Sequence, residues 1–302
     1  MKHPLTFTIV LAAIAATATA CSTDEATEVT SDQPLTAVDG MDDSVVHIHG
    51  LGVDPADGAL YVATHLGLFR VDPETGEPGR VANRYQDTMA FTVAGPRQFL
   101  ASGHPDLRED LPPHLGLIES TDGGETWKPL AKQGEADFHI LEPAGDALYA
   151  YDAITGSLLR TEDYKTFEEV LQAPLISVAV TGTSAPSSTP APTDSDVLAT
   201  TGEGQLILIE PDSGRVAEVE APELAYLDST PAGEVAGIGP QGQVYVSLNR
   251  GSLWDERGTI NGQPGAFAVT DQGWFAATED TVLRSDDQGN SWTTILPRPD
   301  PQ

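Results

Sequence analysis

The chain has 302 residues, with 46 acidic side chains against 15 basic ones, a formal net charge of −31 and a single cysteine. So acidic a surface repels phosphate backbones, which argues against a nucleic-acid partner, and one cysteine excludes a disulfide within the chain. The 29 glycines and 23 prolines, with no sustained 3.6-residue apolar period, favour an all-β chain rich in turns.

The first 20 residues have the pattern of a bacterial lipoprotein signal peptide. Lys2 precedes an apolar run that ends in small residues directly before Cys21, although Ala18 stands where leucine is common. We expect lipidation of Cys21, which would anchor the protein to the outer side of the cytoplasmic membrane. If this lipobox is not used, the protein would be secreted.

The segment that follows, 21–45, is rich in Asp, Glu, Ser and Thr and has few large apolar side chains. It cannot bury enough surface to offset the entropy of ordering, so we expect a disordered acidic tether. The folded domain is then expected over 46–297, with a short tail at 298–302.

From residue 46 onward, a pattern of four short strands recurs along the chain. The first strand of each repeat is expected to start near 47, 89, 138, 175, 224 and 265. These starts are about 37 to 49 residues apart, which is the spacing of four-stranded propeller blades. The sequence predicts a six-bladed β-propeller of antiparallel blades, with seven blades as the alternative, and a Ser/Pro-rich loop at 181–196 inside the fourth blade.

Two octapeptides, STDGGETW at 120–127 and SDDQGNSW at 285–292, share the pattern SxDxGx(S/T)W. The short Asp side chain accepts bonds from nearby backbone N–H groups, and Gly supplies a positive φ, so each segment forms a compact turn between two strands. Weaker copies lie at 161–167 and 247–254. The residues expected to build the two clear turns are Ser120, Asp122, Gly124, Trp127, Ser285, Asp287, Gly289 and Trp292.

These octapeptides resemble the Asp-box (BNR) repeats of sialidase-like and sortilin-like β-propellers. The chain is also similar to bacterial secreted or lipid-anchored Asp-box propellers that are named as glycosyl hydrolases. The likeness is carried by HIHG at 47–50, ATHLGL at 63–68, ASGHP at 101–105 and DFH at 137–139. It implies the fold, and it places each box between the third and fourth strands of a blade, as scaffold on the bottom rim.

On this blade assignment, all six histidines beyond the signal peptide reach the opposite face: His47, His49, His65, His104, His114 and His139. Imidazoles from adjacent blades suit a copper or zinc site, and a thioether would shift the preference toward copper. The candidate ligands are His47, His49, His65, His104, His139 and Met89. The same histidines could instead bind a non-metal ligand or bond to loop carbonyls.

The sequence therefore predicts a monomeric lipoprotein propeller that binds a small ligand, a metal or a carbohydrate, rather than an enzyme. One alternative is an exo-acting, sialidase-like glycoside hydrolase with catalytic carboxylates among Asp87, Asp106 and Asp137. Against it, Arg70, Arg160 and Arg284 each occupy the same place in their own blades, before the bottom turn, and form no substrate clamp. Another alternative is a sortilin-like docking platform.

Overall fold

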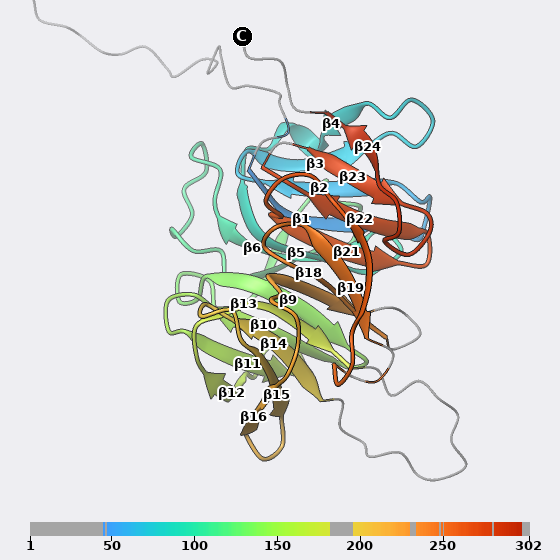
Figure 1. The fold of residues 1–302 in the computed structure, drawn as a ribbon. Coiled ribbons are helices and arrows are strands. Elements are labelled where there is room, and N and C mark those ends of the chain that lie inside the picture. Colours follow the sequence, from blue (N-terminus) through green and yellow to red (C-terminus); the bar gives the residue numbers. More distant parts are fainter. Residues whose placement is uncertain are drawn as a thin grey trace, which may run out of the picture. The chain divides into compact units, whose positions relative to one another are not determined.

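A computed structural model describes residues 45, 47–181, 196–229, 234–247, 249, 251–279 and 281–297. The expected signal peptide, all but the last residue of the expected tether, and the tail from residue 298 lie outside this range. The fold is all-β, and the predicted six blades are confirmed (Figure 1). The seven-bladed alternative is wrong, because the described strands form six sheets of four.

Each blade consists of four consecutive antiparallel strands. The first three blades contain β1 (Ile48–Val53), β2 (Leu60–Thr64), β3 (Gly67–Val71) and β4 (Pro78–Arg80); β5 (Asp87–Gly95), β6 (Gln98–His104), β7 (Leu117–Ser120) and β8 (Lys128–Ala131); and β9 (Phe138–Ala144), β10 (Ala147–Asp152), β11 (Ser157–Thr161) and β12 (Glu168–Gln172).

The last three blades follow the same order. They contain β13 (Leu175–Val180), β14 (Val197–Thr201), β15 (Leu206–Glu210) and β16 (Arg215–Val219); β17 (Tyr226–Ser229), β18 (Val235–Ile238), β19 (Gln243–Ser247) and β20 (Asp255–Thr259); and β21 (Ala266–Thr270), β22 (Gly273–Ala277), β23 (Val282–Ser285) and β24 (Thr293–Leu296). Every first strand begins within two residues of its expected start.

The blades form a closed ring through their first strands. β1 contacts β5, β5 contacts β9, and the series continues through β13, β17 and β21 back to β1. Because each sheet uses its own four consecutive strands, no strand among the described residues is exchanged between the first and last blades. The ring is therefore closed by side-chain packing.

That packing divides the core into six apolar clusters, and each cluster joins two neighbouring blades. Phe91 and Phe99 of the second blade pack with Tyr61 of the first, for example, and Phe275 of the last blade packs with Val62 and Phe69 of the first. The second strand of a blade is buried on both faces, as in LYVAT of β2, whereas outer strands such as β16 are exposed. This burial explains the nearly continuous apolar runs of the inner strands.

The propeller has two ends, which we call the turn face and the mouth face. The turn face carries the connections between first and second strands and between third and fourth strands. Asp54, after β1, accepts a bond from the backbone N–H of Arg97, after β5, and the Arg97 guanidinium donates to the carbonyl of Asp122, after β7. The mouth face carries the connections between second and third strands.

All four octapeptide segments lie on the turn face, between the third and fourth strands of their blades. In the turn after β7, Ser120 Oγ accepts the N–H of Gly124 at 2.8 Å, and Asp122 accepts both the N–H and the hydroxyl of Thr126. Asp287 accepts the same two bonds from Ser291. The weaker copies also form turns, in which Asn249 and Asp163 act as acceptors.

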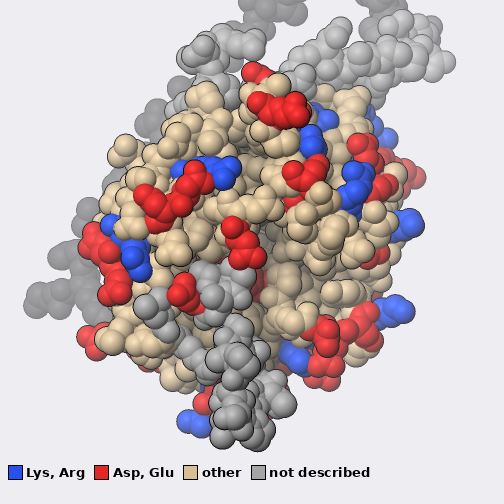
Figure 2. Space-filling view, turned by 90° about the vertical axis from the view of Figure 1, so that its right-hand side faces the viewer, with Lys and Arg blue, Asp and Glu red and all other residues tan. Residues whose placement is uncertain are grey.

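The Ser/Pro-rich segment at 181–196 separates β13 from β14, as expected, and residues 182–195 lie outside the described range. In the part of the chain that the structure describes, no helix is long and apolar enough to span a membrane, and η1 (Val81–Asn83) is a single 3₁₀ turn. Figure 2 shows acidic and basic side chains interspersed on one side of the molecule, with uncharged residues between them.

Candidate metal centre

The mouth face gathers histidines because four neighbouring blades share a β-bulge at the start of their first strand. The strand registers skip one residue in each of β1, β5, β9 and β13, and the residues skipped are His49, Met89, His139 and Ile176. A bulge leaves one residue unpaired and changes the direction of its side chain. The same local irregularity thus presents His49 and His139 at the mouth.

A glycine next to His104 brings two further site residues together. Asp87, the first residue of β5, is paired with His104, the last residue of β6. Gly103 has a φ of +139°, and a Cβ at this position would lie 2.0 Å from the carbonyl oxygen of Asp87. Only glycine permits this close approach of the two strand ends.

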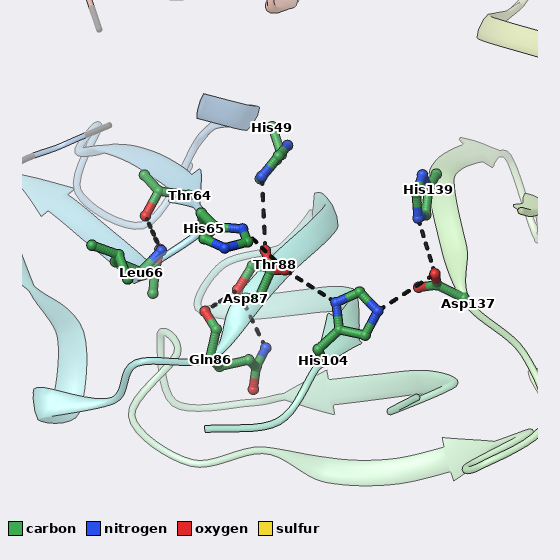
Figure 3. A network of polar contacts seen from close by, with 11 residues as sticks. His49, Thr64, His65, Leu66, Gln86, Asp87, Thr88, His104, Asp137 and His139 are labelled. Carbon is green, nitrogen blue, oxygen red and sulfur yellow. Dashed lines mark hydrogen bonds and ion pairs between the residues drawn. The ribbon is translucent and has the colours of Figure 1, made fainter. Parts of the chain in front are cut away.

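Asp87 is the centre of the first half of the site. Its Oδ2 lies 3.1 Å from His65 Nδ1 and 3.0 Å from His104 Nδ1, and its Oδ1 lies 3.7 Å from His49 Nε2. These three imidazoles come from the first and second blades. Figure 3 shows His49, His65 and His104 pointing toward this one carboxylate.

Asp137 is the centre of the second half. Its Oδ2 lies 3.1 Å from His139 Nε2, 3.6 Å from His104 Nε2 and 3.9 Å from His114 Nδ1. Asp152 fixes the segment, because its side chain accepts the backbone N–H of Asp137 at 3.1 Å. His104 lies between the two aspartates and contacts both, as Figure 3 shows.

Two groups of three side chains bring their donor atoms within 4.8 Å of one another. We call His49, His65 and Asp87 triad A, and His104, His114 and Asp137 triad B. Four of their buried polar atoms have no hydrogen-bond partner: His49 Nε2, Asp87 Oδ1, His114 Nδ1 and Asp137 Oδ1. Each triad therefore holds one imidazole nitrogen and one carboxylate oxygen that the protein leaves unsatisfied.

Such atoms are rare, because burial of a polar group without a partner costs about 1 to 3 kcal/mol. The contact from His49 to Asp87 at 3.7 Å and that from His114 to Asp137 at 3.9 Å are too long for hydrogen bonds. An ion about 2.1 Å from each donor would need donors roughly 3 to 4 Å apart. The spacing in both triads fits a metal ion.

Burial and neighbouring charges shift the pKa of two of the donors, His49 and Asp137. Burial lowers the pKa of His49, so its imidazole stays neutral, with the neighbouring histidines adding to this effect against the attraction of Asp87. Burial alone would raise the pKa of Asp137, but the bond from His139 and the field of the surrounding imidazoles outweigh it and lower that pKa. Neutral imidazole and ionised carboxylate are the ligating forms.

Three of the ligand candidates from the sequence lie outside both triads, although one of them, His139, contacts Asp137 at 3.1 Å. His47 precedes β1 with a φ of +51°, so strand alternation does not relate it to His49, and its exposed ring meets the ring of His65 edge-on at 6.2 Å. Met89 occupies the bulge position of β5 and is half-buried. His114, which the sequence placed at the mouth without selecting it as a ligand, belongs to triad B.

The third carboxylate candidate, Asp106, is engaged elsewhere. The Arg108 guanidinium holds the pKa of Asp106 well below its usual range, and Asp106 also accepts the N–H of Tyr85 at 2.8 Å. No ion pair joins Asp106 to a histidine among the described residues. Its bonds tie the β6–β7 loop to the segment before β5.

The three repeat arginines pair with acids in or near the turns of their own blades. Arg70 binds Asp57, Arg160 binds Glu162 and Arg284 binds Asp286, at 2.6 to 2.8 Å. These contacts lie at the turn-face ends of the strands. The arginines therefore do not form the substrate clamp of a sialidase.

The central channel holds two carboxyl groups that sequence reasoning missed. Glu142 of β9 and Asp228 of β17 both line a cavity of 610 Å³ near the turn face and a narrower one of 160 Å³ that extends to His49 and His139. Burial raises the pKa of Asp228 to about 7, and burial together with the Asp228 charge raises the pKa of Glu142. Each is the single acidic residue of its inner strand, which was the available signal.

Comparisons with known proteins identify the fold. No protein-family model matches the chain, and no curated protein matches it. Among solved structures, the gluconolactonase XC5397 from Xanthomonas campestris has a TM-score of 0.62 at 12% identity, over 84% of this chain and 87% of that one.

Two further structures show weaker likeness. PorZ, a surface component of the type-IX secretion system of Porphyromonas gingivalis, gives a TM-score of 0.52 at 12% identity, over 84% of this chain and 33% of that one. YCF48 bound to D1 peptide gives 0.49 at 16% identity, over 83% and 82%. At such identities the resemblance shows the β-propeller fold alone.

Proposed function

We propose that this protein is a metal-binding β-propeller whose mouth holds a divalent transition metal on imidazole and carboxylate donors. The observation that carries the proposal is the set of four buried, unpartnered ligand atoms in triads A and B. A purely structural network would satisfy these atoms with hydrogen bonds. A metal ion satisfies an imidazole nitrogen and a carboxylate oxygen at the same time.

The donor types favour particular metals. Each triad supplies two imidazoles and one carboxylate, a set that suits Zn²⁺ and also Fe²⁺. Neither triad includes the Met89 thioether, which would have favoured copper. Zinc is therefore the first ion to test, with iron, copper and nickel beside it.

We also propose that the protein acts outside the cytoplasm, anchored by a lipid on Cys21. The support is the signal-peptide pattern ahead of this cysteine. Fractionation of cells that express the wild-type chain or Cys21→Ser tests the anchor. The wild type is expected in the membrane fraction and the variant in the soluble extracytoplasmic fraction, and an unchanged distribution would contradict lipidation.

Metal content and thermal unfolding test the metal site. Purified protein is expected to carry at least one equivalent of metal, to lose it to a chelator, and to unfold at a lower temperature afterwards. Binding at 100 times Kd stabilises the native state by about 2.7 kcal/mol, so adding Zn²⁺ should restore a clear shift. Metal-free protein whose unfolding temperature ignores all four ions would contradict the proposal.

A second candidate function is metal-assisted hydrolysis of a lactone or ester. Three protein donors leave coordination positions open, and the His65 side chain is 58% exposed, so a metal here would be within reach of a substrate. The gluconolactonase of similar fold suggests lactones as the first substrates to assay. Hydrolysis that requires metal and disappears with Asp87→Asn would support it, and no turnover across lactones and esters would count against it.

The glycosidase alternative has less support. Each of Asp87 and Asp137 contacts three histidines, which suits a ligand more than a general acid that must stay protonated. Hydrolysis of a glycoside panel by the metal-free protein would reverse this preference.

A further inference from the structure

We infer that the mouth binds two metal ions at once, one in triad A and one in triad B, and that His104 couples them. This inference rests on the proposed function, since it specifies how the same mouth binds metal. It predicts a definite stoichiometry and a dependence of one site on the other.

The two triads are separate and equivalent. They share no residue, and each offers two imidazoles and one carboxylate. Each also contains one unpartnered buried nitrogen and one unpartnered buried oxygen, on His49 and Asp87 in triad A and on His114 and Asp137 in triad B. A single ion in either triad would leave the other pair unsatisfied.

His104 connects the triads through its two ring nitrogens. Nδ1 lies 3.0 Å from Asp87 Oδ2, and Nε2 lies 3.6 Å from Asp137 Oδ2. A neutral imidazole carries one N–H. When Nδ1 donates that hydrogen to Asp87, Nε2 presents its lone pair toward an oxygen of Asp137, so two acceptors face each other. A cation in triad B turns this unfavourable contact into two coordination bonds.

The bond to Asp87 favours that tautomer of His104, and an ion in triad A is compatible with this bond. Coordination through Asp87 Oδ1, the unpartnered oxygen, leaves Oδ2 free to accept from His104 Nδ1. A carboxylate that orients a ligating histidine in this way typically changes metal affinity by 10- to 100-fold. Asp87 of triad A thus prepares the His104 ligand of triad B.

The mouth also offers variants that act on one triad at a time. His65 belongs to triad A alone and His114 to triad B alone, and their side chains are 58% and 29% exposed, so neither substitution removes a core residue. His47, which belongs to neither triad and whose ring meets the His65 ring edge-on, is the matched control.

The experiment is a titration of metal-free purified protein with Zn²⁺ against a chromophoric chelator. The wild type and His47→Ala are expected to bind two equivalents, and His65→Ala and His114→Ala one each. In Asp87→Asn, which removes the carboxylate partner of His104 as well as a triad A ligand, the remaining ion should bind 10- to 100-fold more weakly than the triad B ion of the wild type. Circular dichroism of the metal-free variants checks the fold.

Each result decides between the proposals. One equivalent in the wild type would overturn the two-ion inference and leave the metal-binding function standing. Two equivalents in the wild type, with an unchanged triad B affinity in Asp87→Asn, would overturn the coupling through His104. No binding by folded wild-type protein would overturn the proposed function itself.

Discussion

The two faces of the propeller use aspartate in opposite ways. On the turn face, Asp122 accepts bonds from Ser120 and from both the N–H and the hydroxyl of Thr126. On the mouth face, Asp137 is buried and Asp87 is half-buried, and each keeps one oxygen without a partner. Satisfied carboxylates stabilise a turn by themselves, whereas unsatisfied ones need a ligand. The comparison assigns scaffold to one face and binding to the other.

The largest effect is expected from neutralising one carboxylate on the mouth face. Asp87→Asn keeps the side-chain shape but removes the charge and one anionic metal ligand that three histidines surround. We expect the metal affinity of triad A to fall by at least about 100-fold, as measured by competition with a chelator. The metal-free variant should unfold within about 1 kcal/mol of the wild type, and unchanged affinity would show that Asp87 is not a ligand.

The channel between the two faces differs from both of them. Its carboxyl groups, on Glu142 and Asp228, have no lysine or arginine among the residues that line the channel. Glu142 accepts the N–H of Val180 through Oε1, and its raised pKa means that the native state binds the proton more tightly than the unfolded state. Its contribution to stability is thus present at low pH and lost as pH rises through the raised value.

Glu142→Gln keeps the acceptor for Val180 and cannot ionise. The variant should match the wild type below the unfolded pKa of about 4.3 and become the more stable of the two as pH rises through the raised pKa of Glu142. Thermal unfolding across this range measures the difference. A constant difference between the two proteins at all pH values would show that Glu142 does not titrate as described.

The smallest effect is expected on the turn face. Asp122→Ala removes bonds to Ser120 and Thr126 in an exposed turn, so we expect a loss of about 1 kcal/mol, which is a shift of roughly 2 to 4 °C in a domain of this size. Metal affinity should not change. A loss of metal binding in this variant would remove the distinction between the faces.

The contribution of Asp122 to stability depends on pH in the opposite direction to that of Glu142. Bonds from Thr126 lower the pKa of Asp122 to about 2. Its stabilisation is therefore present above the unfolded pKa of about 3.9 and is lost as pH falls through 2. The stability gap between wild type and Asp122→Ala should narrow between pH 4 and pH 2.

The sequence was sufficient for the architecture because the fold repeats. Apolar strands at regular spacing and the octapeptides at 120–127 and 285–292 set the register of the blades, and that register placed the histidines on one face. It also explained why Arg70, Arg160 and Arg284 recur without forming a site.

The pairing within the site could not be predicted, because it depends on departures from regular geometry. His49 and His139 occupy β-bulges, which strand alternation does not reveal, and Gly103 brings Asp87 against His104. His114 comes from a loop that a bond from Gly134 to its carbonyl holds in place. In a chain with 46 acids, a single acid in each of two inner strands did not show that Glu142 and Asp228 line the same channel.

Anomalous diffraction from crystals of zinc-loaded protein tests the central claim most directly. We predict anomalous peaks at the zinc edge within about 2.3 Å of His49 Nε2 and Asp87 Oδ1 in triad A, and of His114 Nδ1 and an oxygen of Asp137 in triad B. Absence of any peak at an ordered mouth, with water bonded to these atoms instead, would contradict the assignment of this face as a metal centre.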